Sequence, residues 1–226
     1  MNTKITLLFL LIGLVAFGQK IPKDKKQLIA SVENHKEELI SISDQIWANA
    51  EIAFQETESS KLLADYAEAN GFAVERGVAD IPTAFIATYG EGKPVISVLG
   101  EFDALPGISQ KAQPTKEPLE AGAAGHGCGH NLFGTASLGA AIAVKEMIEA
   151  GEIKGTVKFI GTPAEEKFFG KLWMLEAGVW DDVDVNVSWH PSADTKSDVQ
   201  SSLAMVDFIV EFNGQAAHAA ADPWNG

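Results

Sequence analysis

Two largely apolar runs with valine and isoleucine, PVISVLGEF at 94–102 and GTVKFIGTP at 155–163, flank a small-residue helical segment, NLFGTASLGAAIAVKEMIEAG at 131–151. Because each run is nearly continuous rather than alternating, it predicts a strand that is covered on both faces. Buried strands that alternate with helices are typical of parallel sheets. We therefore predict an α/β domain with a mostly parallel central sheet flanked by helices.

Further elements surround this unit. Apolar residues at helical spacing predict helices at residues 25–49, 57–69 and 165–179. Short β-rich runs predict strands at residues 72–78, 83–90 and 184–191. Asn70-Gly71 is a typical helix stop, and His35, among charged residues of the first helix, is expected at the surface.

The pattern changes after Pro191. A polar linker follows, and then apolar residues alternate along one predicted strand at Val206, Phe208, Val210 and Phe212. Alternation is typical of a sheet with one solvated face. We therefore expect residues 19–200 to form the main domain and residues 201–226 to begin a separate, smaller α+β domain that stays incomplete.

The N-terminus, MNTKITLLFLLIGLVAFG at 1–18, has the composition of a secretory signal peptide. Its apolar run is short for a membrane span, and Ala16-Phe17-Gly18 offers small residues for cleavage. We expect an exported protein, periplasmic or secreted, without stable membrane association after cleavage. An uncleaved N-terminal anchor is the alternative.

The formal charge of −14 argues against nucleic acid as a partner, because phosphates attract clustered lysine and arginine. Cys128 is the single cysteine, so it is a thiol, a thiolate or a metal ligand rather than half of an intramolecular disulfide. It lies two residues before His130 in the glycine-rich stretch GHGCGHN at 125–131. Gly127 and Gly129 allow backbone conformations that other residues resist.

Three polar groups follow predicted strands, where open α/β sheets place their binding crevice. They are Cys128 with His130, the pair Glu165 and Glu166, and His190. Thiolate, imidazole and carboxylate together suit Zn²⁺ and also accept Mn²⁺ or Co²⁺. We predict a metal centre in which the cation and the following helix N-terminus hold Cys128 as a thiolate. Glu166 would bind metal, and Glu165 would take a proton from an activated water.

Each group also has a simpler interpretation when it is taken alone. A single cysteine is most often a small apolar residue, and Cys-x-His arises by chance. Glu165 and Glu166 fit a solvated helix start, where carboxylates suit the helix dipole. His190 can be a strand-end histidine without a task. The metal prediction depends on all of these groups occurring together.

The combined motifs resemble the aminoacylase and carboxypeptidase G group of dinuclear metallopeptidases and amidohydrolases. The resemblance runs from about residue 25 to residue 226 and is carried by LGEFDALPG, HGCGHN, TPAEEKFFGKLWMLEAGVWDDVD, SWHP and FNGQAAHAA. It is strongest for the Cys-x-His branch, which includes hydrolases of hippurate, indole-acetyl amino acids and p-aminobenzoyl-glutamate. The resemblance implies a zinc-peptidase-like catalytic domain followed by a ferredoxin-like lid and dimerisation domain.

The resemblance also implies a role for each matched residue. It identifies four ligands for a pair of divalent ions, Zn or Mn and possibly Co: Cys128, His130, Glu166 and His190. Glu165 corresponds to the general base, and Asp103 to a supporting aspartate beneath the metal loop. Glu101 stands where other branches have a ligand histidine, which makes it a further candidate. His218 matches the lid histidine that reaches the substrate carbonyl, often in the active site of a neighbouring protomer.

The implied activity is hydrolysis of the amide bond in an N-acyl or N-aroyl amino acid, such as p-aminobenzoyl-glutamate, or in a dipeptide. The lid, when complete, would support a homodimer or hetero-oligomer. Relatives continue further and contribute a late histidine ligand, but no histidine follows His218. We therefore expect these 226 residues alone to bind metal weakly and to have little activity.

Two other functions remain open from the sequence. A cysteine amidase would use Cys128 as nucleophile with His130 or His126 as base, and it would resist chelators. A non-catalytic amino-acid or peptide binder would have the fold without needing the base Glu165.

Overall fold

The computed structural model of the chain describes residues 21–197, 204–206, 208–211, 215–218 and 220–225. The predicted signal peptide at 1–18 lies outside the described residues. The chain divides into two compact units, one that ends at Pro191 and one from Ser192 to Gly226. The division falls where the composition of the sequence changes. In the described part of the chain, no helix combines the length and apolar character that crossing a membrane requires.

The described strands of the first unit form one five-stranded sheet in the order β1-β2-β4-β3-β5. Their bounds are Ala73–Arg76 for β1, Phe85–Glu91 for β2, Val95–Gly100 for β3, Gly155–Gly161 for β4 and Val185–Val187 for β5. β3 pairs in parallel with β4 and β5, whereas β2 pairs antiparallel with β1 and β4. Every strand except β2 therefore runs in the same direction, which confirms the predicted α/β class with a mostly parallel sheet.

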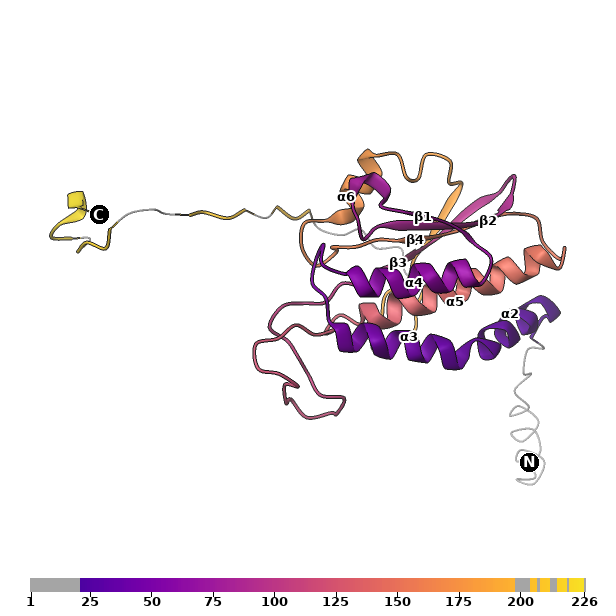
Figure 1. Cartoon of the computed structure of the whole chain (residues 1–226), viewed down its shortest axis with the longest axis horizontal. Helices are drawn as coiled ribbons and strands as arrows, with labels where there is room; N and C mark the ends of the chain where they lie inside the picture. Colours follow the sequence, from indigo (N-terminus) through magenta and orange to yellow (C-terminus); the bar gives the residue numbers. More distant parts are fainter. Residues whose placement is uncertain (1–20, 198–203, 207, 212–214, 219, 226) are drawn as a thin grey trace, which may run out of the picture. The chain divides into compact units, whose positions relative to one another are not determined.

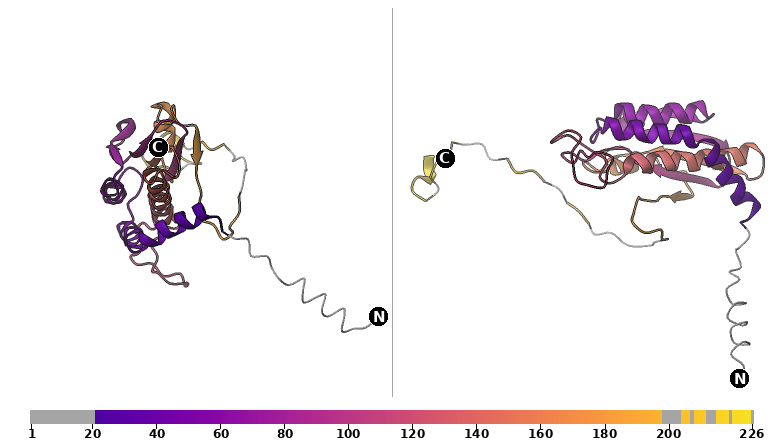
Figure 2. Two further views of the ribbon diagram at one scale, coloured as in Figure 1. Left: turned by 90° about the vertical axis from the view of Figure 1, so that its right-hand side faces the viewer. Right: turned by 90° about the horizontal axis from the view of Figure 1, so that it is seen from below.

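Helices flank this sheet. Their bounds are Lys23–Asn34 for α2, Lys36–Asn49 for α3, Thr57–Ala69 for α4, His130–Glu149 for α5 and Gly170–Glu176 for α6, with a 3-10 turn η1 at Val78–Asp80. Figure 1 shows α4 and α5 along one face of the sheet, α3 beyond them, and α6 on the other face. The rotated views in Figure 2 show the same layers.

The alternation of side chains along the strands divides the core into two layers. Phe85 of β2 and Phe159 of β4 are fully buried against α3, α4 and α5, beside Leu138. Ile160 points to the opposite face and packs with Met174 of α6. The run at 94–102 likewise contributes Phe102 to the first layer and Leu99 to the second. Both runs that predicted buried strands therefore contribute side chains to both layers, as their largely apolar sequence required.

The first predicted helix is two helices in the structure. α2 and α3 are separated at His35, whose backbone does not continue the helix. Its Nδ1 lies 2.8 Å from the Tyr66 hydroxyl, and its Nε2 lies 3.0 Å from Glu146 Oε1. His35 is thus only partly exposed, and the expectation of a simple surface residue was wrong. It joins the α2–α3 break to α4 and α5.

The predicted helix at 165–179 is shorter in the structure. α6 begins only at Gly170, because Phe168 and Phe169 have φ of 72° and 54°, in the left-handed region. A right-handed helix cannot pass through such residues. The segment before α6, which includes Glu165 and Glu166, is therefore a loop rather than a helix turn.

The described part of the second unit contains one short element, the 3-10 turn η2 at Pro223–Asn225. The predicted strand at 206–212 is not formed over residues 204–206 and 208–211, and Phe212 lies outside the described residues. Val206 and Phe208 are 85% and 78% exposed. A strand needs partners to be stable, and no described residue pairs with this one. The assignment of this unit to the beginning of a lid domain remains a prediction.

Candidate metal centre

Three parallel strands deliver the candidate residues to one edge of the sheet. Gly100 at the end of β3 pairs with Gly161 at the end of β4, so the segments 101–103 and 162–166 leave the sheet side by side. β5 runs parallel to β3 and ends at Val187, shortly before His190. The carboxyl edge of a parallel sheet is the usual place for a site in such folds.

The start of α5 lies against this edge. Gly129 precedes the helix with φ of 81°, a conformation that favours glycine. Gly134, in the first turns, approaches the backbone of the β3 loop so closely that a Cβ there would lie 2.6 Å from the carbonyl oxygen of Glu101. The absence of a side chain at 134 therefore allows the helix to place Cys128 and His130 beside the strand ends.

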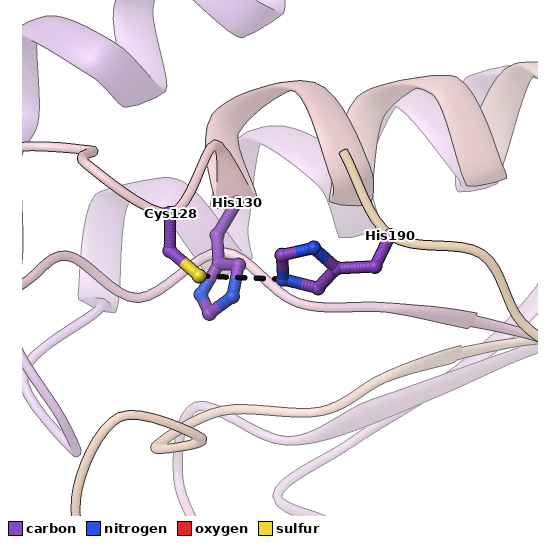
Figure 3. A group of neighbouring side chains, drawn as sticks. All are labelled: Cys128, His130 and His190. Atoms are coloured by element: carbon purple, nitrogen blue, oxygen red, sulfur yellow. Dashed lines mark hydrogen bonds between the residues drawn. The ribbon is translucent and has the colours of Figure 1, made fainter. Parts of the chain in front are cut away.

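Cys128, His130 and His190 converge at this place, as Figure 3 shows. Cys128 Sγ lies 3.3 Å from His190 Nε2, and the rings of His130 and His190 are 5.7 Å apart between centroids. One ligand atom from each of these residues lies within 4.8 Å of the others. His190 Nδ1 donates to the carbonyl of Pro191 at 2.9 Å, which leaves Nε2 with its lone pair directed at Cys128.

His130 is oriented by Asp103, and both residues are buried. The Nδ1–H of His130 lies 2.9 Å from Asp103 Oδ1 and 3.1 Å from the Asp103 carbonyl. The second carboxylate oxygen of Asp103 accepts from the backbone N–H of Glu166 at 2.9 Å. A carboxylate that fixes the tautomer of a histidine is a common support for a metal ligand. Asp103 supports two candidate ligands at once.

Three carboxylates surround the ring of His130. Glu101 Oε2 lies 2.9 Å from His130 Nε2, and Glu165 Oε2 lies 3.9 Å from the same nitrogen. Glu166 Oε1 lies 3.9 Å from His130 Nδ1. Glu101, His130 and Glu165 form a second group whose ligand atoms lie within 4.8 Å of one another. His130 therefore belongs to two overlapping sets of potential ligands.

The buried polar atoms at this site fit a divalent cation. Among the described residues, Glu101 Oε2, His130 Nε2 and Glu166 Oε1 are buried without a hydrogen-bond partner, and the 2.9 Å contact between the first two is not aligned as a hydrogen bond. Buried polar atoms without partners are costly. A divalent ion would satisfy them together, and the nitrogen, oxygen and sulfur donors match the ligands that Zn²⁺ prefers.

The protein's own charges oppose a thiolate. Burial raises the pKa of Cys128 to about 12, and Glu166, Glu165 and Glu101 add to this effect. The expectation that the helix N-terminus helps to hold a thiolate is therefore outweighed by three nearby carboxylates. A bound cation would be needed to stabilise the thiolate.

Protonation of the neighbouring groups also reflects the concentrated negative charge. Burial lowers the pKa of His130, but the hydrogen bond to Asp103 and the close carboxylate of Glu101 outweigh this effect and raise the pKa to about 10. Burial raises the pKa of Glu166. Burial opposes ionisation of Glu101 as well, yet contacts with His130 and Lys171 leave its pKa lowered. His130 thus carries a proton in the place that a metal ion would take.

The cysteine amidase alternative loses support from this geometry. A nucleophilic cysteine needs a thiolate near neutral pH, whereas the pKa of Cys128 is raised to about 12. Burial lowers the pKa of His126 to about 4, and its Nε2 donates to the carbonyl of Ile46 at 3.0 Å. His126 is therefore a neutral residue anchored to α3 rather than a base for Cys128.

Two residues near the site were not found from the sequence. Lys171 at the start of α6 forms an ion pair with Glu101, and no pattern in the sequence indicated this contact. Glu56 is fully buried and accepts from the backbone N–H of Ala164 at 2.9 Å. A glutamate directly before a helix normally suggests a solvated helix start, so its burial could be found only from the fold.

His218 lies in the second unit, whose position relative to the metal centre is not determined. Its Nδ1 accepts from the backbone N–H groups of Ala220 and Ala221 at 3.3 and 3.1 Å. The structure describes this local turn, and the role of His218 at the substrate remains a prediction.

Comparison with known proteins identifies the family of the chain. Residues 98–222 match the family described as peptidase family M20/M25/M40. The chain is 47% identical over 199 residues to one of the subunits of p-aminobenzoyl-glutamate hydrolase from Escherichia coli (strain K12), covering 87% of this chain and 41% of that protein. It is 33% identical over 157 residues to another subunit of the same hydrolase, covering 64% of this chain and 35% of that protein.

A solved structure shows the same fold. The YXEP protein of Bacillus subtilis, a dinuclear metal-binding peptidase of the M20 family, superposes with a TM-score of 0.61 at 31% identity, over 73% of this chain and 44% of that one. The chain thus spans less than half the length of the relatives described here.

Proposed function

Because the chain belongs to peptidase family M20/M25/M40, we propose that it forms the metal-binding part of a hydrolase that cleaves the amide bond of an N-acyl or N-aroyl amino acid. The observation that supports this most directly is the convergence of Cys128, His130 and His190 within 4.8 Å, with Glu165 and Glu166 beside them.

The candidate ligands are Cys128, His130, Glu166 and His190, with Glu101 as an additional oxygen donor. A bound divalent cation would supply Lewis acidity towards the amide carbonyl and would make water more acidic. Zn²⁺ fits the mixed sulfur, nitrogen and oxygen donors best, Mn²⁺ and Co²⁺ remain alternatives, and the B. subtilis neighbour is described as dinuclear. We propose two ions in the whole protein.

Glu165 is the proposed general base. Its side chain is 43% exposed, whereas that of Glu166 is 14% exposed. The more exposed carboxylate can reach water and substrate, and burial of the other carboxylate suits a metal ligand. Glu165 would accept a proton from the attacking water and pass it to the departing amine. Asp103 would hold His130 and the Glu166 backbone in place during this transfer.

The names of two relatives support a proposal for the substrate and the assembly. Two E. coli relatives are different subunits of one p-aminobenzoyl-glutamate hydrolase. We propose an aromatic N-acyl amino acid as substrate, and a homodimer or a hetero-oligomer as the working form. Residues 201–226 would belong to the lid that supports this assembly and presents His218 to the substrate carbonyl.

Export is part of the same proposal and depends on the composition of residues 1–18. N-terminal sequencing of the protein purified from a bacterial periplasm tests it. Cleavage after Gly18 is the expected result. A cytoplasmic protein with an intact N-terminus would contradict it.

The function is tested by incubating the chain with Zn²⁺ or Mn²⁺ and p-aminobenzoyl-glutamate and measuring released p-aminobenzoate by chromatography. We expect slow release that chelator abolishes and metal restores. Glu165→Gln should abolish release and leave metal binding intact, because the base is lost and the ligands are kept. Chelator-resistant turnover that Cys128→Ser abolishes would favour a cysteine amidase. If the chain binds metal and substrate without turnover, both alone and in its homodimer or hetero-oligomer, the result would favour a non-catalytic amino-acid or peptide binder.

A further inference from the structure

Glu56 is a fully buried carboxylate that the proposed chemistry does not use. It directly precedes α4, but its side chain does not cap that helix. Glu51 takes that position instead and accepts from the backbone N–H groups of Glu58 and Ser59 at 3.0 and 2.8 Å. Burying a carboxylate is costly unless it makes specific hydrogen bonds, so the contacts of Glu56 need an explanation other than helix capping.

The Glu56 carboxyl group contacts two distant segments. Oε2 accepts from the Thr83 hydroxyl at 3.1 Å, and Oε1 accepts from the backbone N–H of Ala164 at 2.9 Å. Ala164 is itself fully buried and directly precedes Glu165. Its φ is 58°, in the left-handed region that costs a residue with a Cβ about 1 kcal/mol or more. The hydrogen bond from Glu56 therefore holds a strained residue next to the proposed base.

Two residues after Ala164, the backbone N–H of Glu166 donates to the Asp103 carboxylate. The loop that carries Glu165 is thus held on both sides, by Glu56 before it and by Asp103 after it. The segment of Glu56 also reaches the Asp103 loop, because the N–H of Ala104 donates to the carbonyl of Glu51 at 2.8 Å. Residues 51–56 consequently link two of the segments that form the metal centre, the loops that follow β3 and β4.

We propose that Glu56 is a positioning residue that fixes the backbone of Ala164 and thereby aims Glu165 and Glu166 at the metal centre. Burial raises the pKa of Glu56 to about 7, so the group is partly uncharged near neutrality. An oxygen acceptor, rather than a negative charge, is then what the position requires. Glutamine at position 56 keeps that acceptor and should preserve the function of Glu56. A side chain without an acceptor within reach of the Ala164 N–H should not preserve it.

The test is a Co²⁺ titration of the whole chain, in which the thiolate-to-cobalt absorption of Cys128 reports binding without any need for turnover. Glu56→Gln should bind Co²⁺ within about threefold of wild type. Glu56→Met, of similar size but without the acceptor, and Glu56→Asp, which is one methylene too short, should each bind at least about tenfold more weakly, the usual effect of losing a supporting partner.

Thr83→Val is the matched control, because it removes the other hydrogen bond of the same carboxyl group and leaves Ala164 bonded. Thr83→Val should lower the urea midpoint of unfolding. Its Co²⁺ affinity should be no weaker than that of Glu56→Gln. If Glu56→Met does not fold, by circular dichroism, the comparison of Glu56→Asp with Glu56→Gln decides.

Equal affinity in Glu56→Asp and Glu56→Gln, or a loss in Thr83→Val as large as that in Glu56→Asp, would overturn the positioning role. The inference rests on the proposed function only through the metal centre. Absence of the cobalt–thiolate band in the wild-type chain would refute that centre. Normal binding in every variant would refute only the role of Glu56.

Discussion

The buried carboxyl group of Glu56 makes folding stability depend on pH in a direction opposite to that of an ordinary paired carboxylate. Burial raises its pKa from 4.5 to about 7 in the folded protein, whereas the unfolded chain titrates near the ordinary value. Between these values the folded state binds more protons than the unfolded state. The contribution of Glu56 to the free energy of unfolding is therefore largest below pH 4.5 and is lost as the pH rises towards 7.

The size of this effect follows from the shift. The difference between about 7 and 4.5 corresponds to up to about 3 kcal/mol at about 1.4 kcal/mol per unit. Glu56→Gln removes the titration and keeps the acceptor for Ala164. The variant should gain stability relative to wild type, by up to about 3 kcal/mol, between pH 4.5 and 8.

Urea unfolding of both proteins at pH 4.5 and pH 8, with chelator present, measures this difference. Other groups titrate equally in both proteins and cancel. The difference in the free energy of unfolding between Glu56→Gln and wild type should change between pH 4.5 and pH 8. If it is the same at both pH values within about 0.5 kcal/mol, the usual limit of additivity, the assignment of a raised pKa to Glu56 is refuted.

Three further outcomes follow from the site and the fold. Asp103→Asn should weaken metal binding by about 10- to 100-fold, because it disturbs the hydrogen bonds to His130 and to the Glu166 amide. Calorimetry measures this affinity, and an unchanged value would show that Asp103 supports neither residue. Metal binding should release protons, since the pKa values of His130 and Cys128 are raised to about 10 and about 12, so affinity should rise with pH by up to about 100-fold per unit between pH 6 and 8. Calorimetry in buffers of different ionisation enthalpy measures that release, and a flat pH profile would contradict it. Gly134→Ala should cost about 1–3 kcal/mol of stability in urea unfolding, because its Cβ would meet the Glu101 carbonyl at 2.6 Å; a neutral effect would mean that α5 moves away without cost.

Local sequence patterns predicted the elements whose cause is local. The buried strands β3 and β4 and the helix α4 follow from apolar runs and spacing, and α4 has the predicted bounds of 57–69. The break at His35 was missed, because its partners Tyr66 and Glu146 lie far away in the sequence. The start of α6 was missed for a different reason. Phe168 and Phe169 adopt left-handed conformations, and neither is a glycine, the residue type that usually indicates such a conformation in a sequence.

The candidate site divides in the same way. Glu166 and His190 could be selected because they follow predicted strands, and parallel strands end at one edge. Cys128 and His130 could be selected because a cysteine and a histidine lie two residues apart in a glycine-rich stretch before a predicted helix. Glu56 and Lys171 could not be selected, because their roles depend on contacts with Ala164 and Glu101 that only the folded chain creates.

β5 is attached to the sheet through three residues of one neighbour, and its Val185 and Val187 remain half exposed. Beyond it, the Trp189 indole N–H bonds to Ser137 on α5, and His190 reaches Cys128. An ion bound by Cys128, His130 and His190 would therefore connect the segment after β5 to the start of α5. Metal occupancy and docking of this strand are then thermodynamically linked. Slower hydrogen exchange of the amides of 185–187 on adding metal would therefore reveal a loaded centre even in a protein without turnover.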